Sequence, residues 1–430
     1  MPNYDIIIVG AGIAGLYSAH RILKQSPDLS ILILESESKS DIGGRMGNDQ
    51  FYGASVVKGA GVGRKKTDVL LAALLKEFDV EYNEFVIDHK FSPKIQDQVV
   101  DVNKIVAFLR KIYKQNQSNP IKQQQQPIKQ QFKEFAIEHL GERLYNQFVL
   151  STGYTDYEDA DVYSVLYLYQ MDNNTSGWTA FHIPWSDLVD KLKQRLGSHR
   201  IKTGQQVSSI QYRDCDFEVV SNSVSTNKQN MFRAKKVIVA TRIDTVKRLF
   251  KGMPVYHQIQ GQPFLYVYAK FNKESAAILK TLVPTYTVVE PPLQKIIPMD
   301  ADKGVYMIAY SDNHNATLLK PYLDDTRESN KRYFERQMER ALGLNGSGSG
   351  SALRIIAFTS YYWKIGTHYL EPLYTRNYRN LQQMLDRAQH PVPGILVVGE
   401  AVSAHQGWTE GALESADRVL TRDWIQHPGF

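Results

Sequence analysis

A glycine-rich turn near the N-terminus constrains the fold of this chain more than any other feature. It reads GAGIAG over residues 10–15, the pattern GxGxxG, and the β-branched run YDIIIV precedes it at residues 4–9. Residues 13–23 have the apolar spacing of a helix, and LSILIL at residues 29–34 is typical of a second buried strand. Strand, glycine turn, helix and strand in this order predict the opening of a βαβ unit and an α/β fold.

The same turn predicts a binding site for a dinucleotide. Gly10 allows a tight turn, Gly12 lets the backbone approach a pyrophosphate, and Gly15 lets helix and strand pack closely. Ala14 lies in the first helical turn, where free N–H groups and the helix dipole attract an anion. Glu35 ends the second strand, twenty residues after Gly15, so its carboxylate is placed to bind a ribose diol and to repel a 2′-phosphate.

A second motif distinguishes a flavin from a nicotinamide cofactor. The segment DIGGRM occupies residues 41–46, where Gly43 and Gly44 allow close backbone approach and Arg45 can pair with phosphate oxygens. A glutamate, a short spacer and Gly-Gly-Arg resemble the large family of flavin amine oxidases, phytoene desaturases and protoporphyrinogen oxidases. The resemblance implies that this segment contacts FAD, with Arg45 near the pyrophosphate or the flavin.

The C-terminal part of the chain resembles the same family. GEA at residues 399–401 and GWTEGALES at residues 407–415 are similar to the family's closing motif, a Gly-Glu pair and then Gly-x-x-Glu-Gly-Ala before a helix. Val207 matches the position whose backbone meets the adenine. The resemblance thus adds six residues to the expected FAD site: Gly61, Val207, Gly399, Glu400, Thr409 and Ala412.

Because the two motifs lie at opposite ends of the chain, the FAD domain must be discontinuous. We expect a Rossmann-like FAD-binding domain and a mixed α+β substrate-binding domain. The expected FAD domain comprises residues 1–65, 195–250 and 385–430, and the substrate domain comprises residues 66–194 and 251–384. Residues 115–131, with a glutamine run and two prolines, predict a flexible insertion, and GSGSGS at residues 346–351 predicts a flexible loop outside the functional argument.

The resemblance also implies a reaction and residues for it. Trp408 falls where amine oxidases place an aromatic side chain facing the flavin, and His368 or Tyr369 falls in the segment that supplies the opposite wall. Such a pair can desolvate an amine and orient its lone pair. Many amine oxidases also carry a lysine that is water-bridged to the flavin. At that position the chain has Tyr266, so Lys270 would need another register, and Lys364 lacks support from spacing.

Three functions remain open at this stage. The leading one is hydride transfer from an amine or amino acid to a non-covalently bound FAD, with O2 as acceptor and H2O2 as product. The second is a desaturase or isomerase acting on an apolar substrate, since such relatives lack the lysine. It predicts apolar side chains around Tyr266 and no charged entrance to the pocket. The third is an FAD-binding protein without turnover.

Several other residues have weaker assignments. Arg64 lies near a segment where amino-acid oxidases bind a substrate carboxylate, but the register is off by about two residues, and Lys65 and Lys66 favour a solvated basic loop. Cys215, the one cysteine, is far from the motif that carries a covalent flavin link, so we interpret it as a structural thiol. The eleven histidines include no pair at metal-binding spacing, so we expect no metal.

Composition excludes other classes of protein. The 51 basic and 45 acidic residues are interspersed and give a formal charge of +6 without a compact basic motif, so nucleic acid is not an expected partner. No run approaches the ~20 apolar residues of a membrane span. The N-terminus lacks the charged and apolar regions of a signal peptide, so we expect a cytoplasmic enzyme acting on a small molecule.

Overall fold

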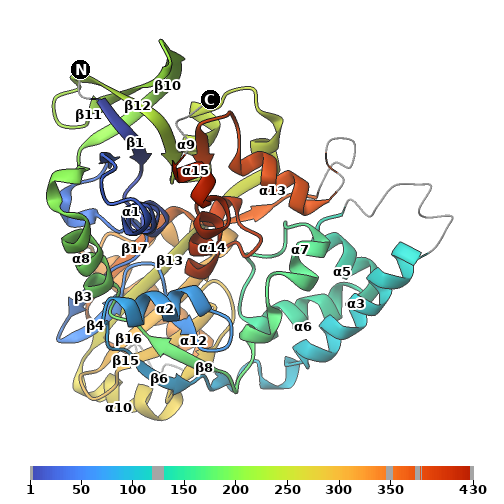
Figure 1. The fold of residues 1–430 in the computed structure, drawn as a ribbon. Helices are drawn as coiled ribbons and strands as arrows, with labels where there is room; N and C mark the ends of the chain where they lie inside the picture. The colour runs from blue at the N-terminus through green and yellow to red at the C-terminus, as the bar shows by residue number, and fades with distance from the viewer. Residues whose placement is uncertain (1–2, 119–129, 345–351, 373–377, 379, 427–430) are drawn as a thin grey trace.

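The computed structural model describes residues 3–118, 130–344, 352–372, 378 and 380–426. Of the predicted flexible insertion, residues 115–118 belong to a helix, and residues 119–129 lie outside the described residues. The predicted loop at residues 346–351 lies outside them as well. Figure 1 shows the chain as a ribbon, with the first sheet at the top, a second sheet below it and a group of helices to one side.

The first sheet confirms the predicted α/β fold. It has seven strands. Six of them follow the order β10-β11-β12-β1-β2-β9, and the seventh, β18, pairs with β12. Strands β1, β2, β9, β12 and β18 are parallel. Strand β10 pairs with β11, and β11 pairs with β12, and both of these pairings are antiparallel. The strands of this sheet are β1 (Asn3–Val9), β2 (Ile31–Leu34), β9 (Ile201–Lys202), β10 (Gln205–Arg213), β11 (Asp216–Ser223), β12 (Gln229–Val239) and β18 (Ile395–Val397).

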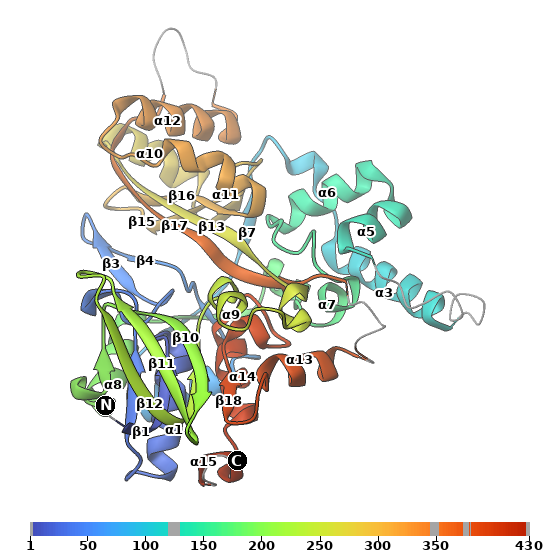
Figure 2. The same ribbon diagram turned by 90° about the horizontal axis from the view of Figure 1, so that it is seen from above.

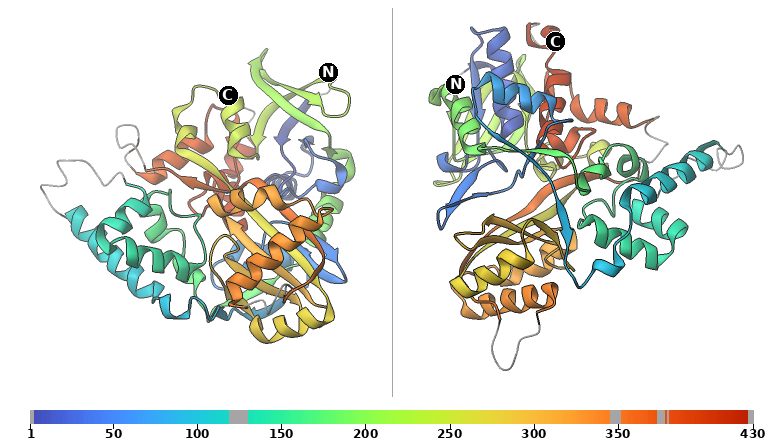
Figure 3. Two further views of the ribbon diagram at one scale, coloured as in Figure 1. Left: turned by 180° about the vertical axis from the view of Figure 1, so that it is seen from behind. Right: turned by 90° about the horizontal axis from the view of Figure 1, so that it is seen from below.

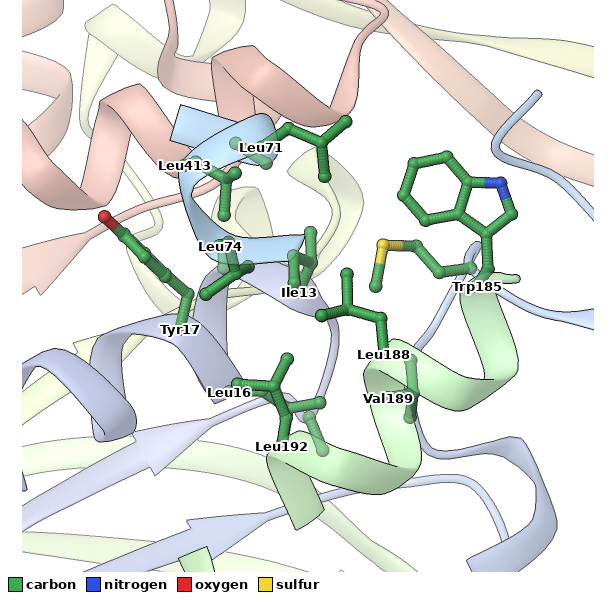
Figure 4. Close-up of a cluster of buried hydrophobic side chains, with 14 of the residues drawn as sticks. Ile13, Leu16, Tyr17, Leu71, Leu74, Trp185, Leu188, Val189, Leu192 and Leu413 are labelled. Carbon is green, nitrogen blue, oxygen red and sulfur yellow. The ribbon is translucent and has the colours of Figure 1, made fainter. Parts of the chain in front are cut away.

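The strands β1, β2 and β18 of this sheet are buried on both faces, as their continuous apolar runs require. Because successive side chains point to opposite faces, Ile6 and Ile8 join one apolar cluster, while Ile7 and Val9 join another. The first cluster is covered by four helices. Figure 4 shows their apolar side chains converging, including Leu16 and Leu192. These helices are α1 (Ile13–Gln25), α2 (Val69–Glu77), α8 (Trp185–Leu196) and α14 (Thr409–Val419).

The second sheet has six strands in the order β17-β13-β16-β15-β14-β7. Figure 2 shows three helices covering the face of this sheet that points away from the first sheet. The strands are β7 (His89–Phe91), β13 (Ile259–Phe271), β14 (Tyr286–Val288), β15 (Lys295–Asp300), β16 (Val305–Asp312) and β17 (Ile355–Leu370), and the helices are α10 (Lys273–Leu282), α11 (Asn313–Leu319) and α12 (Glu328–Leu342).

A group of four helices forms a third layer with its own apolar cluster. It projects to one side of the two sheets in Figures 1 and 3. The helices are α3 (Val102–Ser118), α5 (Phe132–Leu140), α6 (Glu142–Thr152) and α7 (Val162–Tyr167). The remaining elements are β3 (Asn48–Phe51), β4 (Ala54–Val57), β5 (Gly63–Arg64), β6 (Asn83–Val86), β8 (Thr179–His182), α9 (Ile243–Leu249), α13 (Leu381–Gln389) and α15 (Arg422–Gln426).

The first apolar cluster joins residues of both sheets, since Phe264 and Tyr266 of β13 belong to it together with Ile6 of β1. Helices α2 and α8, which the expected boundaries assign to the substrate domain, also pack in this cluster. The division of the chain into two domains therefore stays a prediction.

The parallel strands of the first sheet end along one edge. Strands β1, β2, β12 and β18 end at Val9, Leu34, Val239 and Val397. The glycine turn, Glu35 and the Gly-Glu pair at residues 399–400 follow directly at this edge. In open α/β sheets this carboxyl edge is where ligands bind, so the fold brings both ends of the chain to one site.

Candidate active site

One large cavity runs along this edge and continues to the second sheet. Its volume is about 1200 Å³, larger than the ~300–1,000 Å³ of pockets for drug-sized ligands. Most of the predicted site residues line it: Gly10, Gly12, Ala14, Glu35, Gly43, Gly44, Arg45, Gly61, Val207, His368, Gly399, Glu400, Trp408, Thr409 and Ala412. Most of the predicted cofactor residues and two of the four predicted catalytic residues, His368 and Trp408, thus share one space.

Helix α1 begins at this cavity with free donors. Its N-cap residue, Gly12, supplies no side-chain hydrogen bond to the first turn, and a Cβ added there would have no atom within 4 Å. Gly15 does not line the cavity, because it lies against the carbonyl oxygen of Gly10, which a Cβ would overlap. The turn therefore offers open N–H groups to an anion, and Gly15 serves the close packing of strand and helix.

The Glu35 carboxylate lies beside this turn and is held by backbone donors. Its Oε2 accepts a 2.6 Å hydrogen bond from the N–H of Ala11, and its Oε1 accepts a 2.9 Å hydrogen bond from the N–H of Glu37. Val207 of β10 lines the same part of the cavity. A carboxylate fixed at the end of β2 has the position that a ribose diol requires.

Glu400 is the centre of a buried cluster that joins distant parts of the chain. Its carboxylate accepts hydrogen bonds from the Arg45 guanidinium at 3.2 Å, from the N–H of His368 at 2.9 Å and from the N–H of Gly407 at 2.7 Å. The His368 Nδ1 lies 2.6 Å from Oε2, and its Nε2 accepts from the N–H of Ile243, which fixes Nδ1 as the donor. Burial alone would raise the pKa of Glu400, but the His368 ring, Arg45 and these N–H donors lower it to about 2.

This cluster leaves His368 without a free ring nitrogen, since both are occupied by Glu400 and Ile243. Tyr369, the next residue on β17, lies on the other face of the strand and packs against the helical cluster instead of the cavity. The structure therefore brings His368 to the cavity and does not bring Tyr369 there.

Trp408 lies at the start of α14 and is fixed by two neighbours. Its Nε1–H donates to Asp68 at 2.8 Å, and the Arg64 guanidinium lies 3.8 Å from the centre of its ring. Arg64 also pairs with Asp68 at 3.1 Å and donates to Gln170 at 2.7 Å. The interpretation of Arg64 as a solvated loop residue is wrong, because Arg64 is 6% exposed and lines the cavity.

Lys270, the predicted catalytic lysine, does not line the cavity. It lies near the end of β13, where its Nζ contacts the carbonyl of Lys303. Tyr266, at the position where many amine oxidases have the lysine, lines the cavity and donates to the carbonyl of Gly59 at 2.7 Å. Lys364 lines the cavity too. A catalytic role of Lys270 stays a prediction without support from its position.

Sequence reasoning missed the end of the cavity that lies at the second sheet. The side chains there are Tyr154, Asp156, Tyr169 and Tyr310, and Lys295 and Asp312 lie close behind them. The Tyr154 and Tyr310 ring centres are 5.5 Å apart, and those of Tyr310 and Tyr266 are 4.9 Å apart. The signal in the sequence was the group YTDY at residues 154–157, which belongs to no motif.

The described residues contain no helix that is long and apolar enough to cross a membrane. They also contain no group of three or more His, Cys, Asp or Glu side chains that could hold a metal ion.

Comparison with known proteins decides the family. The family model of flavin-containing amine oxidoreductases matches residues 13–419 of this chain. The chain belongs to this family. It is therefore an FAD-dependent oxidoreductase, as the resemblance of its motifs implied. Its residues fit FAD, since one cavity has an uncapped helix N-terminus, the carboxylate of Glu35 and room for a dinucleotide.

Solved structures share the fold. A cyclohexylamine oxidase from Brevibacterium oxydans matches with a TM-score of 0.70 and 14% identity, over 97% of this chain and 98% of that one. An engineered triple mutant of putrescine oxidase matches with a TM-score of 0.69 and 15% identity, over 97% of each chain. The wild-type putrescine oxidase bound to putrescine matches with a TM-score of 0.66 and 14% identity, over 97% of this chain and 98% of that one.

Similarity to curated sequences is more local. Thiamine thiazole synthase from Fusarium oxysporum f. sp. lycopersici is 33% identical over 113 residues, which are 25% of this chain and 33% of that protein. The synthase from Fusarium vanettenii is 34% identical over the same length, with the same shares of the two chains. The chain thus spans about one third of the length of the curated relatives it matches, and their activity is not transferred to it.

Proposed function

We propose that this enzyme oxidises the C–N bond of an amine, with O2 as the final electron acceptor and H2O2 as a product. The observation that supports the proposal is the continuity of the cavity from the glycine turn to an aromatic end with Trp408, Tyr266 and Tyr310. FAD bound in this cavity supplies a hydride acceptor. The residues of the chain would bind and orient the amine and exclude water from it.

Each group of residues has a proposed task. Gly12, Glu35, Arg45 and Glu400 would hold the cofactor, without a covalent link. Trp408 would form one aromatic wall for the substrate nitrogen, and its hydrogen bond to Asp68 and its contact with Arg64 would keep the ring in place. Aromatic faces next to a nitrogen lower the polarity around it and favour its neutral form.

The charges around Arg64 favour an amine over an amino acid. A substrate carboxylate needs a cation with unused hydrogen-bonding capacity, but Arg64 already forms an ion pair with Asp68 in the cavity wall. Glu410 and Glu414 lie close enough to stabilise the positive charge of Arg64 as well. Another anion would therefore be repelled from this part of the cavity.

A desaturase or isomerase is the second candidate, and one observation favours it. Next to Tyr266 the cavity is lined by Phe264, Ile297, Met299 and Met307, the apolar surroundings that this function predicts. The two candidates differ in their response to amines. A desaturase would bind apolar molecules, and amines would not reduce its flavin.

The experiment is reduction of the purified, flavin-loaded enzyme without oxygen. The flavin absorbance should disappear on addition of a primary amine and return with oxygen, and a coupled assay should detect peroxide. Amino acids are the matched comparison and should bleach the flavin more slowly than amines of the same chain length. A flavin-loaded protein whose absorbance no amine changes would contradict amine oxidation.

A further inference from the structure

The end of the cavity at the second sheet holds a group of charged side chains that are not among the predicted cofactor-binding residues. Asp156 is partly exposed, and it lines the cavity. Behind it, Asp312 is 1% exposed and Lys295 is 1% exposed. Two carboxylates and one ammonium group thus share a poorly hydrated space, and the group has one negative charge in excess when all three are ionised.

The two carboxylates differ in the number of hydrogen bonds that they accept: Asp312 accepts several, whereas Asp156 does not. The N–H and hydroxyl of Thr155 and the side-chain amide of Gln294 all donate to Asp312, at 3.1, 2.5 and 3.0 Å. The Asp156 side chain accepts one hydrogen bond in the described structure, 2.5 Å long, from the Tyr169 hydroxyl. Burial raises the pKa of Asp312, and these three donors oppose that rise. Asp156 has a single donor and no cation within hydrogen-bond distance among the described residues.

Lys295 does not supply that counterion. Its Nζ is buried without a hydrogen-bond partner among the described residues and lies 3.0 Å from the centre of the Tyr154 ring. Asp312 stabilises the protonated form of Lys295 more than Asp156 does. Burial and the repulsion from Asp312 raise the pKa of Asp156 to about 7, against the attraction of Lys295. A second cation would lower the energy of this site.

The surroundings of Asp156 also suit an ammonium group at the end of an apolar chain. Tyr154, Tyr169 and Tyr310 line the cavity beside Asp156. Aromatic rings stabilise a cation near their faces by about 0.5–2 kcal/mol. A methylene chain would lie against the apolar side chains next to Tyr266. Arg64, a buried cation of the cavity wall, is already paired with Asp68.

We infer that Asp156 binds the distal ammonium group of the substrate, so that the preferred substrates of this enzyme are diamines or polyamines. The inference rests on the proposed amine oxidation and specifies its substrate class. In this arrangement one amino group of the substrate lies in the tyrosine-rich end with Asp156. The other amino group is oxidised elsewhere in the same cavity.

The test compares putrescine with n-pentylamine, in which a methyl group replaces the second ammonium group. For the wild-type enzyme, kcat/KM should be at least tenfold higher for putrescine, since one hydrogen-bonded ion pair in a poorly hydrated site is worth about that factor or more. In Asp156→Asn this preference should fall to less than about threefold, mainly through a higher KM for putrescine. Asp159→Asn is the matched control, because Asp159 does not line the cavity, and it should keep the preference.

A second readout does not depend on turnover. In the dithionite-reduced enzyme, which cannot oxidise an amine, putrescine should raise Tm more than n-pentylamine does, and Asp156→Asn should remove the difference. The flavin spectrum of each variant checks that it is folded and loaded. Equal preference for the two amines in the wild type, or a preference that survives in Asp156→Asn, overturns the inference while amine oxidation stands. A flavin that neither amine reduces overturns the proposed function, and this inference with it.

Discussion

Two carboxylates in the same cavity differ in how completely the protein neutralises them. Glu400 receives hydrogen bonds from Arg45, from the backbone and ring of His368 and from Gly407, and its pKa is lowered to about 2. The Asp156 carboxylate accepts one hydrogen bond, from the Tyr169 hydroxyl, and lies close to the like charge of Asp312. Burial, with repulsion from Asp312 added to it, raises the pKa of Asp156.

The difference indicates which residues build the protein and which await a ligand. A carboxylate that already has a cation and several N–H donors is stable without a ligand and holds the chain together. A carboxylate with one donor and a like charge beside it is stabilised when a cation binds. At the cofactor end Glu400 thus stabilises the chain in addition to lining the proposed FAD site, whereas Asp156 at the other end is placed to bind a cation.

The largest effect should come from removing the completed cluster. Glu400→Ala would leave Arg45 and three N–H donors without their acceptor, and breaking a buried pair in this way costs about 3–5 kcal/mol. We expect an equally large loss in the free energy of unfolding, measured by urea denaturation. Glu400→Gln is the matched control, because it keeps an acceptor and should lose less. An unchanged midpoint for Glu400→Ala would show that the cluster contributes nothing to stability.

The two carboxylates should give opposite dependences of stability on pH. The pKa of Glu400 in the folded state, about 2, lies below its ordinary 4.5, so its contribution is complete above pH 4.5 and is lost as the pH falls toward 2. The pKa of Asp156 is raised above 3.8, so stability is highest below pH 3.8 and is lost as the pH rises through the raised value.

Variants separate these two dependences. Each unit of pKa shift corresponds to about 1.4 kcal/mol. Asp156→Asn should therefore unfold at a higher urea concentration than the wild type at pH 8, with a smaller difference at pH 4. Glu400→Gln should flatten the loss of stability below pH 4.5. If Asp156→Asn is destabilised at pH 8, then Asp156 already has a counterion in the protein.

Sequence reasoning located the cofactor end of the cavity because close approach to a dinucleotide imposes local patterns. Gly12, Glu35 and Glu400 each follow a strand end, so strand patterns and short motifs were sufficient to place them. His368 and Tyr369 are adjacent on the long strand β17, and the motif match alone did not decide which of them faces the cavity. Alternation along one strand resolves this ambiguity, since the two side chains point to opposite faces.

The other end of the cavity was not predictable from local patterns. Asp156 lies in the connection between α6 and α7, Lys295 begins β15, and Asp312 ends β16. No spacing in the sequence links these positions, because pairing within the second sheet and packing of the helical cluster bring them together. Burial of Arg64 was missed for the same reason, since its partners Gln170 and Trp408 are remote in sequence.

A substitution at Glu35, with a smaller expected effect, tests the cofactor end without disturbing the Glu400 cluster. Glu35→Ala removes the acceptor of the Ala11 N–H and the proposed ribose ligand. Loss of a buried acceptor costs about 1–3 kcal/mol, and the purified variant should contain less FAD per chain than the wild type. Glu35→Gln keeps an acceptor and should retain more FAD than the alanine variant. Equal flavin content in all three proteins would contradict the ribose assignment.

The smallest effect should come from an ion pair that resembles the Glu400 cluster in chemistry but is open to solvent. His405 Nδ1 lies 2.6 Å from Glu414, and their side chains are 33% and 36% exposed. The hydrogen bond with Glu414 raises the pKa of His405 above 6.5, so its contribution is complete below pH 6.5 and is lost as the pH rises through the raised value. Solvent screening limits an exposed pair to about 0–1 kcal/mol. Glu414→Gln should therefore shift the urea midpoint slightly at pH 6 and not at pH 9. A loss at pH 6 as large as that of Glu400→Ala would show that burial does not explain why the Glu400 cluster contributes more than this exposed pair.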